Sequence, residues 1–367
     1  MKKIALLRSY PKDAALPRVA AALAEAYEVT CYIWDRQRDF APGAGPANVH
    51  YEKCGLRSGY HSLGTFLKLL LFEAWLFFRL LFAKCDAIHA IDLDTGFVGL
   101  LIAKLRSMPF VYHCLDPYYG SLPQSWPGFL GSVAQKLENI VISYADLFII
   151  TDLLRMPQHE GSRPKRVLEF ANVPSPDISL MRKTGDEAFV AGYIGSLIEG
   201  RDLVNVVEAV GELKGRGVKL VIGGFGPLEE TIKELSQKYD NVLFTSWIPY
   251  EKVLEMERNF DVFVYITDKM NAGQRWVSPN KLFESMAFGT PIIVGEGTLA
   301  ASRVEAAENG VVVSYGSKEE LQRALLDLRD NPHLAGEMGK RGKKEFEKNW
   351  HPERMKRRLL DAYHKII

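Results

Sequence analysis

The stretch SPNKLFESMAFGTPIIVGEG, residues 278 to 297, contains the local pattern that decides the fold of this chain. From Asn280 to Phe288 apolar residues recur at helical spacing, and Gly289-Thr290-Pro291 follows them. Glycine just after a helix and proline soon afterwards are the usual signals that end one. The apolar run Ile292-Ile293-Val294 comes next and predicts a short buried strand. The stretch therefore predicts one helix-turn-strand unit of an α/β fold.

The same alternation of strand-like and helical runs continues in both directions from this unit. The strand-like runs lie at residues 4–7, 29–33, 87–91, 110–114 and 147–150, and then at 189–194, 219–222, 242–245, 262–265, 292–294 and 311–313. Strands that alternate with helices are typical of parallel sheets covered by helices on both faces. We therefore predict an α/β protein built from doubly wound, Rossmann-like sheets.

The chain length and one polar interruption predict two domains. A chain of 367 residues exceeds the size at which a single hydrophobic core usually stops growing. Residues 172–186 combine prolines with a polar run, which is typical of a linker. The predicted domains are residues 1–175 and residues 187–345. In the polar segment 346–367, two aromatic residues predict a final helix that packs back toward the N-terminal domain.

Composition indicates an ordinary soluble protein and gives no sign of nucleic-acid binding. The hydrophobic fraction is 47%, the charged fraction is 25%, and the formal net charge of +1 provides no general attraction to nucleic acid. The apolar run after Met1-Lys2-Lys3 is too short for a signal peptide, so we expect a cytoplasmic protein. The cysteines are widely spaced without a C-x-x-C pair, so we expect reduced core thiols. They are Cys31, Cys54, Cys85 and Cys114.

Residues 64–84, GTFLKLLLFEAWLFFRLLFAK, predict a helix that is apolar around nearly its whole circumference. A membrane-spanning helix would have to bury the charges of Lys68, Glu73 and Arg79, which argues against a transmembrane segment. Lys68 and Arg79 are about three helical turns apart and share one face, from which both can reach lipid headgroups. We predict that this helix, including Trp75, contacts a membrane surface. A core helix covered by protein on both sides is the alternative.

Ligands of open α/β sheets bind at the carboxyl ends of the strands, so strand-to-helix junctions are candidate sites. After residues 189–194 the chain passes through Gly195 and Ser196 to Arg201, which opens a helix. A helix amino end with a nearby cation suits a diphosphate, although a plain turn with a solvated arginine stays open. Gly224 and Gly226, which we also assign to donor binding together with Gly195 and Ser196, follow the next strand. They lack the third glycine of a dinucleotide fingerprint, so the signal for a nicotinamide or flavin site is weak.

Ser278-Pro279-Asn280-Lys281 opens the helix that carries Glu284. Free backbone N–H groups and Lys281 converge at this helix end, where an ionised carboxylate is favoured. A carboxylate held there can accept two hydrogen bonds from a vicinal diol such as a ribose. A simple dipole complement or salt bridge of Glu284 is the alternative.

Two neighbouring strand ends in the first half carry histidines and aspartates, in His89 to Asp94 and in His113 to Asp116. Such groups could hold sugar hydroxyls or transfer protons, and we select His113 and Asp116 as catalytic candidates. A metal site is conceivable, but an Asp-x-Asp pattern after a strand is common by chance, so we expect none. The remaining acceptor-side candidates are Tyr10, Arg18, Asp94 and Tyr118.

The second half resembles the donor domain of GT-B glycosyltransferases, specifically the retaining enzymes of glycosyltransferase family 4. The matching segments are residues 193–197, 201–209, 222–229, 261–265 and 279–293, with fainter matches at 17–26, 89–95, 144–147 and 172–174. The resemblance implies two Rossmann-like domains facing across a cleft. It also implies a nucleotide-diphosphate sugar as co-substrate, transfer with retention of configuration, and no required metal or other cofactor.

Residue by residue, the resemblance implies that Glu284 is the second glutamate of the E-x7-E pattern, which holds the nucleotide ribose. It places Arg201 on the diphosphate, the backbone of Ile248 at the base, and the backbone of residues 278–281 beside the diphosphate and donor sugar. The first glutamate is missing because its position holds Trp276, so a neighbour such as Gln274 or Arg275 would have to replace it. Ser196 and Leu115 also depart from the family pattern, each occupying a position where many members have a basic residue or a histidine.

These observations predict a retaining, hexosyltransferase-type glycosyltransferase of glycan, polysaccharide or glycolipid assembly. Arg201, His113 and Asp116 are the predicted catalytic residues, and the acceptor is expected to be lipid-linked or membrane-associated. We expect a peripheral protein on the cytoplasmic, inner face of the membrane. Two alternatives stay open: a sugar-nucleotide epimerase of GT-B shape, and a non-catalytic two-domain protein that binds a nucleotide or sugar.

Overall fold

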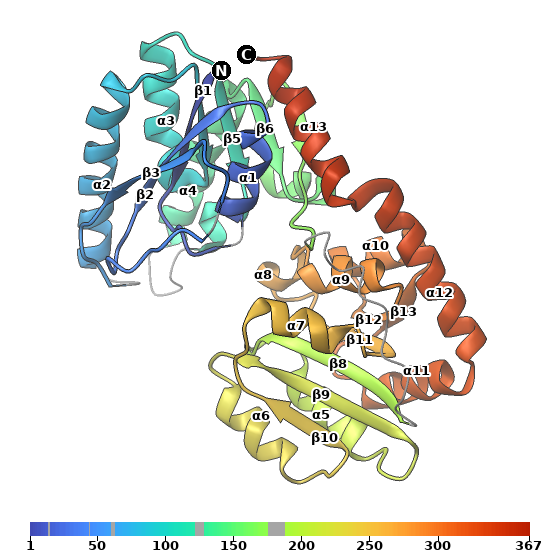
Figure 1. Cartoon of the computed structure of the whole chain (residues 1–367). Coiled ribbons are helices and arrows are strands. Elements are labelled where there is room, and N and C mark those ends of the chain that lie inside the picture. Colours follow the sequence, from blue (N-terminus) through green and yellow to red (C-terminus); the bar gives the residue numbers. More distant parts are fainter. Residues whose placement is uncertain (14, 44, 60–62, 122–127, 175–187) are drawn as a thin grey trace. The chain divides into compact units, whose positions relative to one another are not determined.

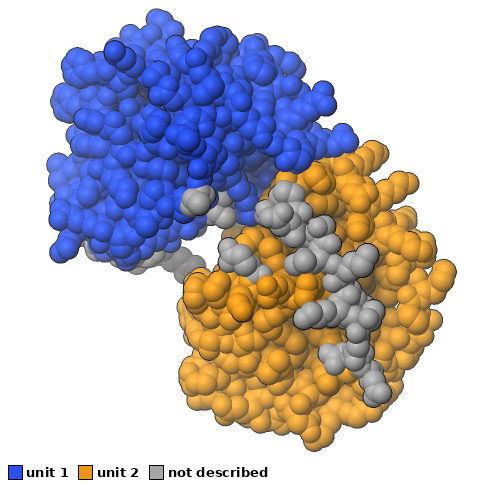
Figure 2. Space-filling model, in the orientation of Figure 1, with its two compact units in different colours: residues 1–172, 353–367 blue, residues 173–352 orange. Residues whose placement is uncertain are grey.

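The computed structural model describes residues 1–13, 15–43, 45–59, 63–121, 128–174 and 188–367, and the chain forms two compact units (Figures 1 and 2). Unit 1 comprises residues 1–172 and 353–367, and unit 2 comprises residues 173–352. The predicted linker falls largely outside the described residues. The predicted final segment 346–367 is divided between the units, because its first part stays with unit 2.

Unit 1 contains a seven-stranded, entirely parallel sheet in the order β3-β2-β1-β4-β5-β6-β7. The strands are β1 Lys3–Arg8, β2 Glu28–Trp34, β3 Val49–Cys54, β4 Ala87–Ile91, β5 Phe110–Cys114, β6 Leu147–Ile150 and β7 Val167–Glu169. The helices are α1 Ala15–Ala24, α2 Leu63–Phe82, α3 Leu93–Leu105, η1 Tyr118–Ser121, α4 Gly128–Tyr144, η2 Leu153–His159 and α13 Pro352–His364. The sequence patterns missed the two edge strands β3 and β7.

Unit 2 contains a six-stranded parallel sheet in the order β10-β9-β8-β11-β12-β13. The strands are β8 Phe189–Ser196, β9 Val218–Phe225, β10 Val242–Thr245, β11 Val262–Tyr265, β12 Ile292–Gly295 and β13 Gly310–Val313. The helices are α5 Leu203–Gly211, α6 Glu229–Ser236, α7 Tyr250–Glu257, α8 Ala272–Arg275, α9 Asn280–Phe288, α10 Leu299–Ala307, α11 Lys318–Asp330, α12 Pro332–Glu345 and η4 Phe346–Trp350. Two parallel Rossmann-like sheets confirm the predicted α/β class.

The stretch 278–297 forms the predicted helix-turn-strand unit. Helix α9 ends at Gly289, which adopts a left-handed conformation with φ of 66°, and every residue of β12 is buried. Glycine suits that conformation because it has no Cβ atom. The buried face of α9 includes Leu282, Phe283 and Glu284. A carboxylate therefore lies on the face that packs into the unit, not on the solvent side.

Two aromatic residues of the C-terminal segment, Trp350 and Tyr363, pack onto different units. Trp350 lies against Phe283 of unit 2, with ring centroids 5.1 Å apart. Tyr363, on α13, is fully buried in unit 1, and its hydroxyl lies 2.6 Å from Nδ1 of His89 on β4. Tyr363 thus joins the last helix to the core of unit 1, although it is far from His89 in sequence. The four cysteines are free, and three of them are buried.

A buried carboxyl group predicts how unit 1 responds to pH. Glu138 on α4 is 1% exposed and accepts hydrogen bonds from the Tyr112 hydroxyl at 2.6 Å and the Tyr118 backbone N–H at 3.2 Å. Burial is the main reason that its pKa rises from 4.5 to about 7. Between these pH values the unfolded chain loses a proton that the folded chain keeps. The stability of unit 1 should therefore fall with rising pH, by about 3 kcal/mol from this group.

Urea unfolding at pH 5 and at pH 8 measures this effect. The fall in unfolding free energy should be smaller by that amount in Glu138→Gln, because glutamine does not titrate. Glu160→Gln, an exposed position in the same unit, serves as the matched control and should behave like the wild type. Identical pH dependence in the wild type and Glu138→Gln would show that the carboxyl is ionised in the folded protein.

Candidate functional site

The strand order of each sheet indicates where a ligand binds. Ligands of open α/β sheets lie beyond the carboxyl ends of the strands, at the point where the strand order reverses. In unit 2 this point lies between β8 and β11, and in unit 1 it lies between β1 and β4. The predicted donor residues Gly195, Ser196 and Arg201 lie at or after the end of β8, and residues 278–284 follow β11.

Arg201 lies at the switch point of unit 2, with its guanidinium held by several neighbours. Its Nη1 donates to the Tyr193 hydroxyl at 3.0 Å and to the Ser196 carbonyl at 3.3 Å, and its Nε donates to Gln274 Oε1 at 3.4 Å. The guanidinium also lies 5.6 Å from the centroid of the Tyr265 ring. These contacts fix a planar cation beside the ends of β8 and β11. A guanidinium in this position can pair with a diphosphate.

Gly224 and Gly226 bring two backbone segments of unit 2 into contact. Both have positive φ, and a Cβ atom on them would meet the Gly195 carbonyl oxygen at 1.7 Å and the Leu197 carbonyl oxygen at 2.4 Å. Any larger residue would push the end of β9 away from the end of β8. The close approach of these strand ends therefore explains why both positions hold glycine, independently of the predicted donor contact.

Glu284 lies fully buried between two hydrogen-bond donors. Lys281 Nζ donates to its Oε2 at 2.7 Å, and the Tyr250 hydroxyl donates to its Oε1 at 2.9 Å. The salt bridge that the sequence left as an alternative is thus present in this structure. A ribose diol would offer the same carboxylate two hydroxyl donors in place of these groups, so ribose binding requires Tyr250 or Lys281 to move.

A second buried glutamate, which the sequence did not single out, shares the same lysine. Glu257 ends α7, is fully buried, and has its Oε1 2.7 Å from Lys281 Nζ. Burial, followed by the charge of Glu284, raises the pKa of Glu257 well above its ordinary value. Burial alone would lower the pKa of Lys281, but Glu284 and Glu257 raise it above its ordinary value. Lys281 is therefore a firmly charged group between two carboxyls.

The position of the missing glutamate is occupied by a partly buried aromatic residue. Trp276 directly follows α8, and the guanidinium of Arg275 lies 5.2 Å from the centroid of its ring. Gln274 instead reaches Arg201. Of the two neighbours considered as replacements, Gln274 is thus the one joined to the predicted diphosphate residue.

The loop after β10 exposes an aromatic ring beside Ile248. Trp247 is 62% exposed, whereas Ile248 is partly buried. A flat exposed ring is a suitable stacking surface for a nucleotide base. The exposed ring of Trp247 is therefore better suited to stack on a base than the side chain of Ile248, the predicted base-reading residue.

The selection of His113 as a catalytic residue requires correction, because its side chain lies in the core of unit 1. It is 1% exposed on β5, with its ring centroid 5.5 Å from that of His89 and 6.0 Å from that of Phe170. Burial, followed by the charge of Arg8, lowers its pKa to about 3. His113 is thus a buried side chain whose lowered pKa favours the neutral imidazole.

A charged cluster at the switch point of unit 1 was only partly visible in the sequence. Arg8, the buried last residue of β1, forms ion pairs with Asp13 and Asp92. Asp92 also accepts a hydrogen bond from the Leu115 backbone N–H at 2.8 Å. These contacts join β1, β4 and the chain after β5, so Arg8 and Asp92 act as the framework of this edge.

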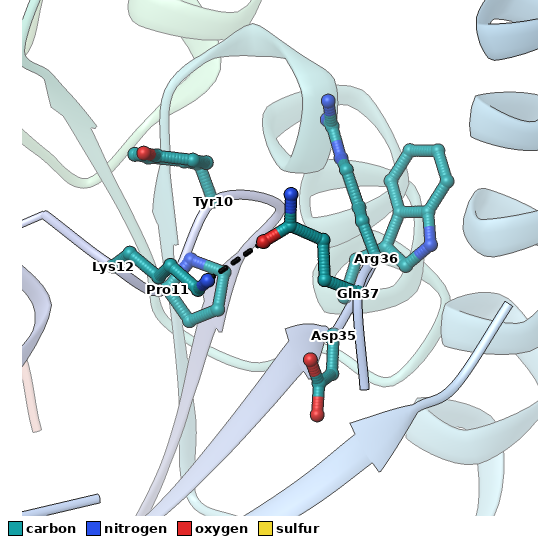
Figure 3. Close-up of a pocket in the computed structure, with 7 residues that line it drawn as sticks. Tyr10, Pro11, Lys12, Asp35, Arg36 and Gln37 are labelled. Carbon is teal, nitrogen blue, oxygen red and sulfur yellow. Dashed lines mark hydrogen bonds between the residues drawn. The ribbon is translucent and has the colours of Figure 1, made fainter. Parts of the chain in front are cut away.

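The acceptor-side candidates surround this framework. Asp94 accepts a hydrogen bond from Ser9, and burial is the main reason that its pKa rises to about 7. Asp116 has a side chain that is 71% exposed and pairs with the buried Arg155 at 2.8 Å. The Tyr118 backbone is held by Glu138. Tyr10 lines a pocket (Figure 3), and Arg18 is partly buried on α1.

Helix α2 corresponds to the predicted apolar helix and is buried on one side only. Phe72, Leu76 and Leu80 are fully buried in the core of unit 1. Trp75 also packs against that core, near Phe72 and Tyr32, so it does not lie on the outer face as a membrane contact would. None of the described helices is long and apolar enough to cross a membrane.

Of the two cations selected on α2, Arg79 is half exposed and pairs with Glu52 on β3, and Lys68 is partly buried. The apolar outer face extends beyond α2, because α3 packs against both α2 and α4. Acidic residues of these helices, Glu73, Asp94 and Glu138, are partly or fully buried, whereas Lys104 and Lys136 are exposed. The exposed large apolar side chains are Leu67, Leu70, Leu71, Phe78 and Phe82 on α2, Phe97, Leu101 and Leu105 on α3, and Phe129, Val133, Leu137, Ile140 and Tyr144 on α4.

One buried group among the described residues has the composition of a metal site. Cys114, Glu138 and His159 bring possible ligand atoms within 4.8 Å of one another. Glu138 is already hydrogen-bonded by Tyr112 and Tyr118, and Cys114 Sγ lies 3.7 Å from its Oε1. These hydrogen bonds link Glu138 and Cys114 to their neighbours without an ion.

Comparison with known proteins shows which family and which solved structures this chain resembles. Residues 181–345, somewhat less than half of the chain, match the family model described as "Glycosyl transferases group 1". The alpha-monoglucosyldiacylglycerol synthase of Acholeplasma laidlawii is 24% identical over 294 residues, which cover 70% of each chain.

Solved structures match almost the whole chain. Sucrose-phosphate synthase of Thermosynechococcus elongatus has a TM-score of 0.79 at 16% identity, covering 100% of this chain and 99% of that one. HepE of Anabaena, solved with UDP and glucose, has a TM-score of 0.72 at 16% identity, covering 99% of this chain and 100% of the other. At this level of identity the likeness shows the fold, which is GT-B.

Proposed function

We propose that this chain, a glycosyltransferase with the GT-B fold, moves a sugar with retention from a nucleotide-diphosphate sugar to a lipid-linked or membrane-associated acceptor. The observation that carries the donor half of this proposal is the set of groups at the carboxyl edge of unit 2. Arg201 is fixed at the switch point, and Lys281 and Glu284 lie on α9, which follows the neighbouring strand. A cation for a diphosphate and a carboxylate for a ribose are thus present at one sheet edge.

The chemistry asks mainly for stabilisation of the leaving nucleoside diphosphate. Its developing negative charge would be met by the guanidinium of Arg201, by Lys281 and by the backbone N–H groups at the amino end of α9. These groups supply fixed positive charge without a metal ion, so we propose a metal-independent reaction. Gln274, joined to Arg201, is the proposed partner of the donor sugar in place of the missing glutamate.

The acceptor half of the proposal rests on the outer face of α2, α3 and α4. Exposed apolar patches of this kind on a soluble unit mark interaction surfaces. The exposed charges on these helices are basic, and the acidic side chains turn inward, a combination that suits an anionic membrane. The relative from Acholeplasma laidlawii is named for a glycolipid product, which agrees with a lipid acceptor. We propose attachment to the cytoplasmic face of the membrane.

A donor panel tests the function. The protein would be incubated with UDP-, GDP- and ADP-sugars and a membrane lipid extract, with and without EDTA. Released nucleotide together with a new glycolipid supports the proposal, and unchanged activity in EDTA supports a metal-independent reaction. An isomerised donor sugar would favour the epimerase, and binding without turnover would favour a non-catalytic binding protein.

Vesicle flotation tests the membrane surface. The protein should float with vesicles rich in phosphatidylglycerol at low salt, and less with neutral vesicles. Leu71→Glu and Phe78→Glu, both on the exposed face of α2, should each reduce the bound fraction about tenfold, because each removes apolar burial and adds a like charge. Leu243→Glu, equally exposed on unit 2, is the control and should still float. Wild-type protein that stays in solution would rule out membrane docking.

A further inference from the structure

Glu257, the last residue of α7, is a fully buried carboxyl group that lacks a well-oriented hydrogen bond. Neither of its oxygens has a hydrogen-bond partner among the described residues, although Lys281 Nζ lies at ion-pair distance, 2.7 Å from Oε1. Proteins usually satisfy their buried polar groups, because an unpaired one bears the full penalty of leaving water. A buried carboxyl in this condition, next to the proposed ribose site, is a candidate for a role that begins when a ligand binds.

Lys281 is shared unequally between two buried carboxyl groups. Its Nζ donates a hydrogen bond to Glu284 Oε2 at 2.7 Å, whereas at Glu257 the contact has the same length without hydrogen-bond alignment. The side chain of Lys281 is only 12% exposed, so an ammonium that left both carboxyls would strand buried charge. Because Nζ is equally near to both carboxyls, rotation of the lysine side chain is enough to transfer its hydrogen bond from one to the other.

Helix α7 contributes to the surroundings of both oxygens of Glu284. Tyr250, its first residue, donates its hydroxyl to Oε1 at 2.9 Å, and Glu257, its last, contacts the lysine that is bound to Oε2. Seven residues are about two helical turns, so these two side chains lie on the same face of α7. A ribose that bonds to both oxygens of Glu284 has to displace a neutral hydroxyl from one of them and an ammonium from the other.

The displaced ammonium requires a second anion, and Glu257 is in place to provide it. Burial, followed by the charge of Glu284, holds the pKa of Glu257 well above its ordinary value, so its ionised form would gain from a full share of Lys281. After the exchange Glu284 is bonded to the ribose and Lys281 to Glu257, so each buried charge keeps a partner. Without Glu257 the same exchange would leave a buried ammonium alone.

We propose that Glu257 is a positioning residue of the donor site, which takes over Lys281 when a ribose hydroxyl binds to Oε2 of Glu284. This inference deepens the proposed function and rests on its assignment of Glu284 to the ribose. Glu257 acts through Lys281 and touches no substrate. The ammonium that it retains stays in the first turn of α9, beside the proposed diphosphate site. One buried carboxyl thus allows the ribose to bind without loss of the positive charge next to it.

Isothermal titration of the full chain with UDP, GDP and ADP, and then with the 2′-deoxy and 3′-deoxy forms of the one that binds most tightly, tests this role. In the wild type each missing hydroxyl should weaken binding about tenfold, because each loses a charge-assisted hydrogen bond. Glu257→Gln should weaken binding of the parent nucleotide about tenfold, since Lys281 then stays on Oε2. One of the two deoxy penalties should shrink to less than about twofold in this variant, and the other should remain.

Two further variants separate positioning from a general loosening of the site. Glu257→Asp keeps the negative charge on a shorter side chain, so its affinity should lie between the wild type and Glu257→Gln, and it carries the test if Glu257→Gln does not fold. Glu255→Gln, at an exposed site on the same helix, is the matched control and should keep both the affinity and the deoxy penalties of the wild type. A loosened site would weaken the parent and deoxy nucleotides by the same factor.

The outcomes distinguish this inference from the function on which it rests. Unchanged affinity in Glu257→Gln, or weaker binding with both deoxy penalties intact, would overturn the role of Glu257 and leave the donor site standing. An equal loss in Glu255→Gln would also overturn it. If the wild type binds none of the three diphosphates, or binds both deoxy forms as tightly as the parent, the ribose assignment itself is wrong and the role of Glu257 falls with it.

Discussion

Replacing Glu284 with glutamine is expected to weaken nucleoside diphosphate binding about 100-fold. An ionised carboxylate can accept a hydrogen bond from each hydroxyl of a ribose, whereas glutamine offers one neutral oxygen and a competing N–H donor. Charge-assisted hydrogen bonds contribute about 1.5–3 kcal/mol each, so their loss costs on the order of 3 kcal/mol, or about 100-fold. Titration with UDP, GDP and ADP measures the change and also identifies the base.

Two further variants separate a ribose contact from a purely structural role of Glu284. Glu255→Gln, on the exposed side of α7, is the matched control and should bind nucleotide like the wild type. Tyr250→Phe removes the hydroxyl that lies 2.9 Å from Glu284 Oε1, where a ribose hydroxyl is proposed to bind, and should leave affinity equal or higher. A Glu284→Gln protein that is less stable but binds nucleotide with unchanged affinity would contradict the ribose assignment.

Replacing Lys281 with methionine is expected to produce the largest loss of stability. Lys281 is 12% exposed and lies 2.7 Å from a carboxylate oxygen of both Glu257 and Glu284, which are fully buried. Removal of one partner from a buried ion pair typically costs about 3–5 kcal/mol, because the remaining charge stays desolvated. For a unit of this size the melting temperature should fall by about 10 °C. Differential scanning calorimetry of the full chain measures this change.

The loss in Lys281→Met should depend on pH in a defined direction. Without the lysine the buried Glu257 carboxyl has lost its counter-charge and binds its proton more tightly in the folded state than in the unfolded chain, so the loss is largest at high pH and shrinks as pH falls toward 4.5. Glu257→Gln should change stability by less than about 1 kcal/mol, because its raised pKa already favours the neutral form. Lys252→Met, at an exposed site on α7, is the control. A small, pH-independent effect of Lys281→Met would contradict the buried-triad interpretation.

The features of the donor site that depend on local sequence were predictable. A helix start, a glycine stop and a strand end depend on neighbouring residues, so the places of Arg201, Lys281 and Glu284 after their strands followed from the pattern alone. The partner Glu257 did not, because it comes from another helix and shows only as the last glutamate of an ordinary amphipathic run. Its role appears once the packing of α7 and α9 brings both carboxyls to one lysine.

Unit 1 gives a second example of side-chain positions that the sequence did not predict. His113 and Asp116 are close in sequence at one strand end, yet one side chain turns into the core and the other toward solvent. His113 is still within β5, whereas Asp116 lies beyond the end of that strand, so the period of the strand does not say which of the two side chains the fold covers. In the same way, the sequence made α2 apolar all round, and only its packing against the sheet showed that Trp75 lies inward and Phe78 outward.

The sequence by itself determined the α/β class, the two parallel sheets and the strand ends at which ligands bind, because hydrophobic periodicity and turn residues act over a few residues. The tertiary structure alone decided which distant side chains meet: Arg8 with Asp92, Lys281 with Glu257, and Trp34 with Phe72. These contacts depend on strand order and on how the helices pack. None of these is encoded by the spacing of residues along the chain.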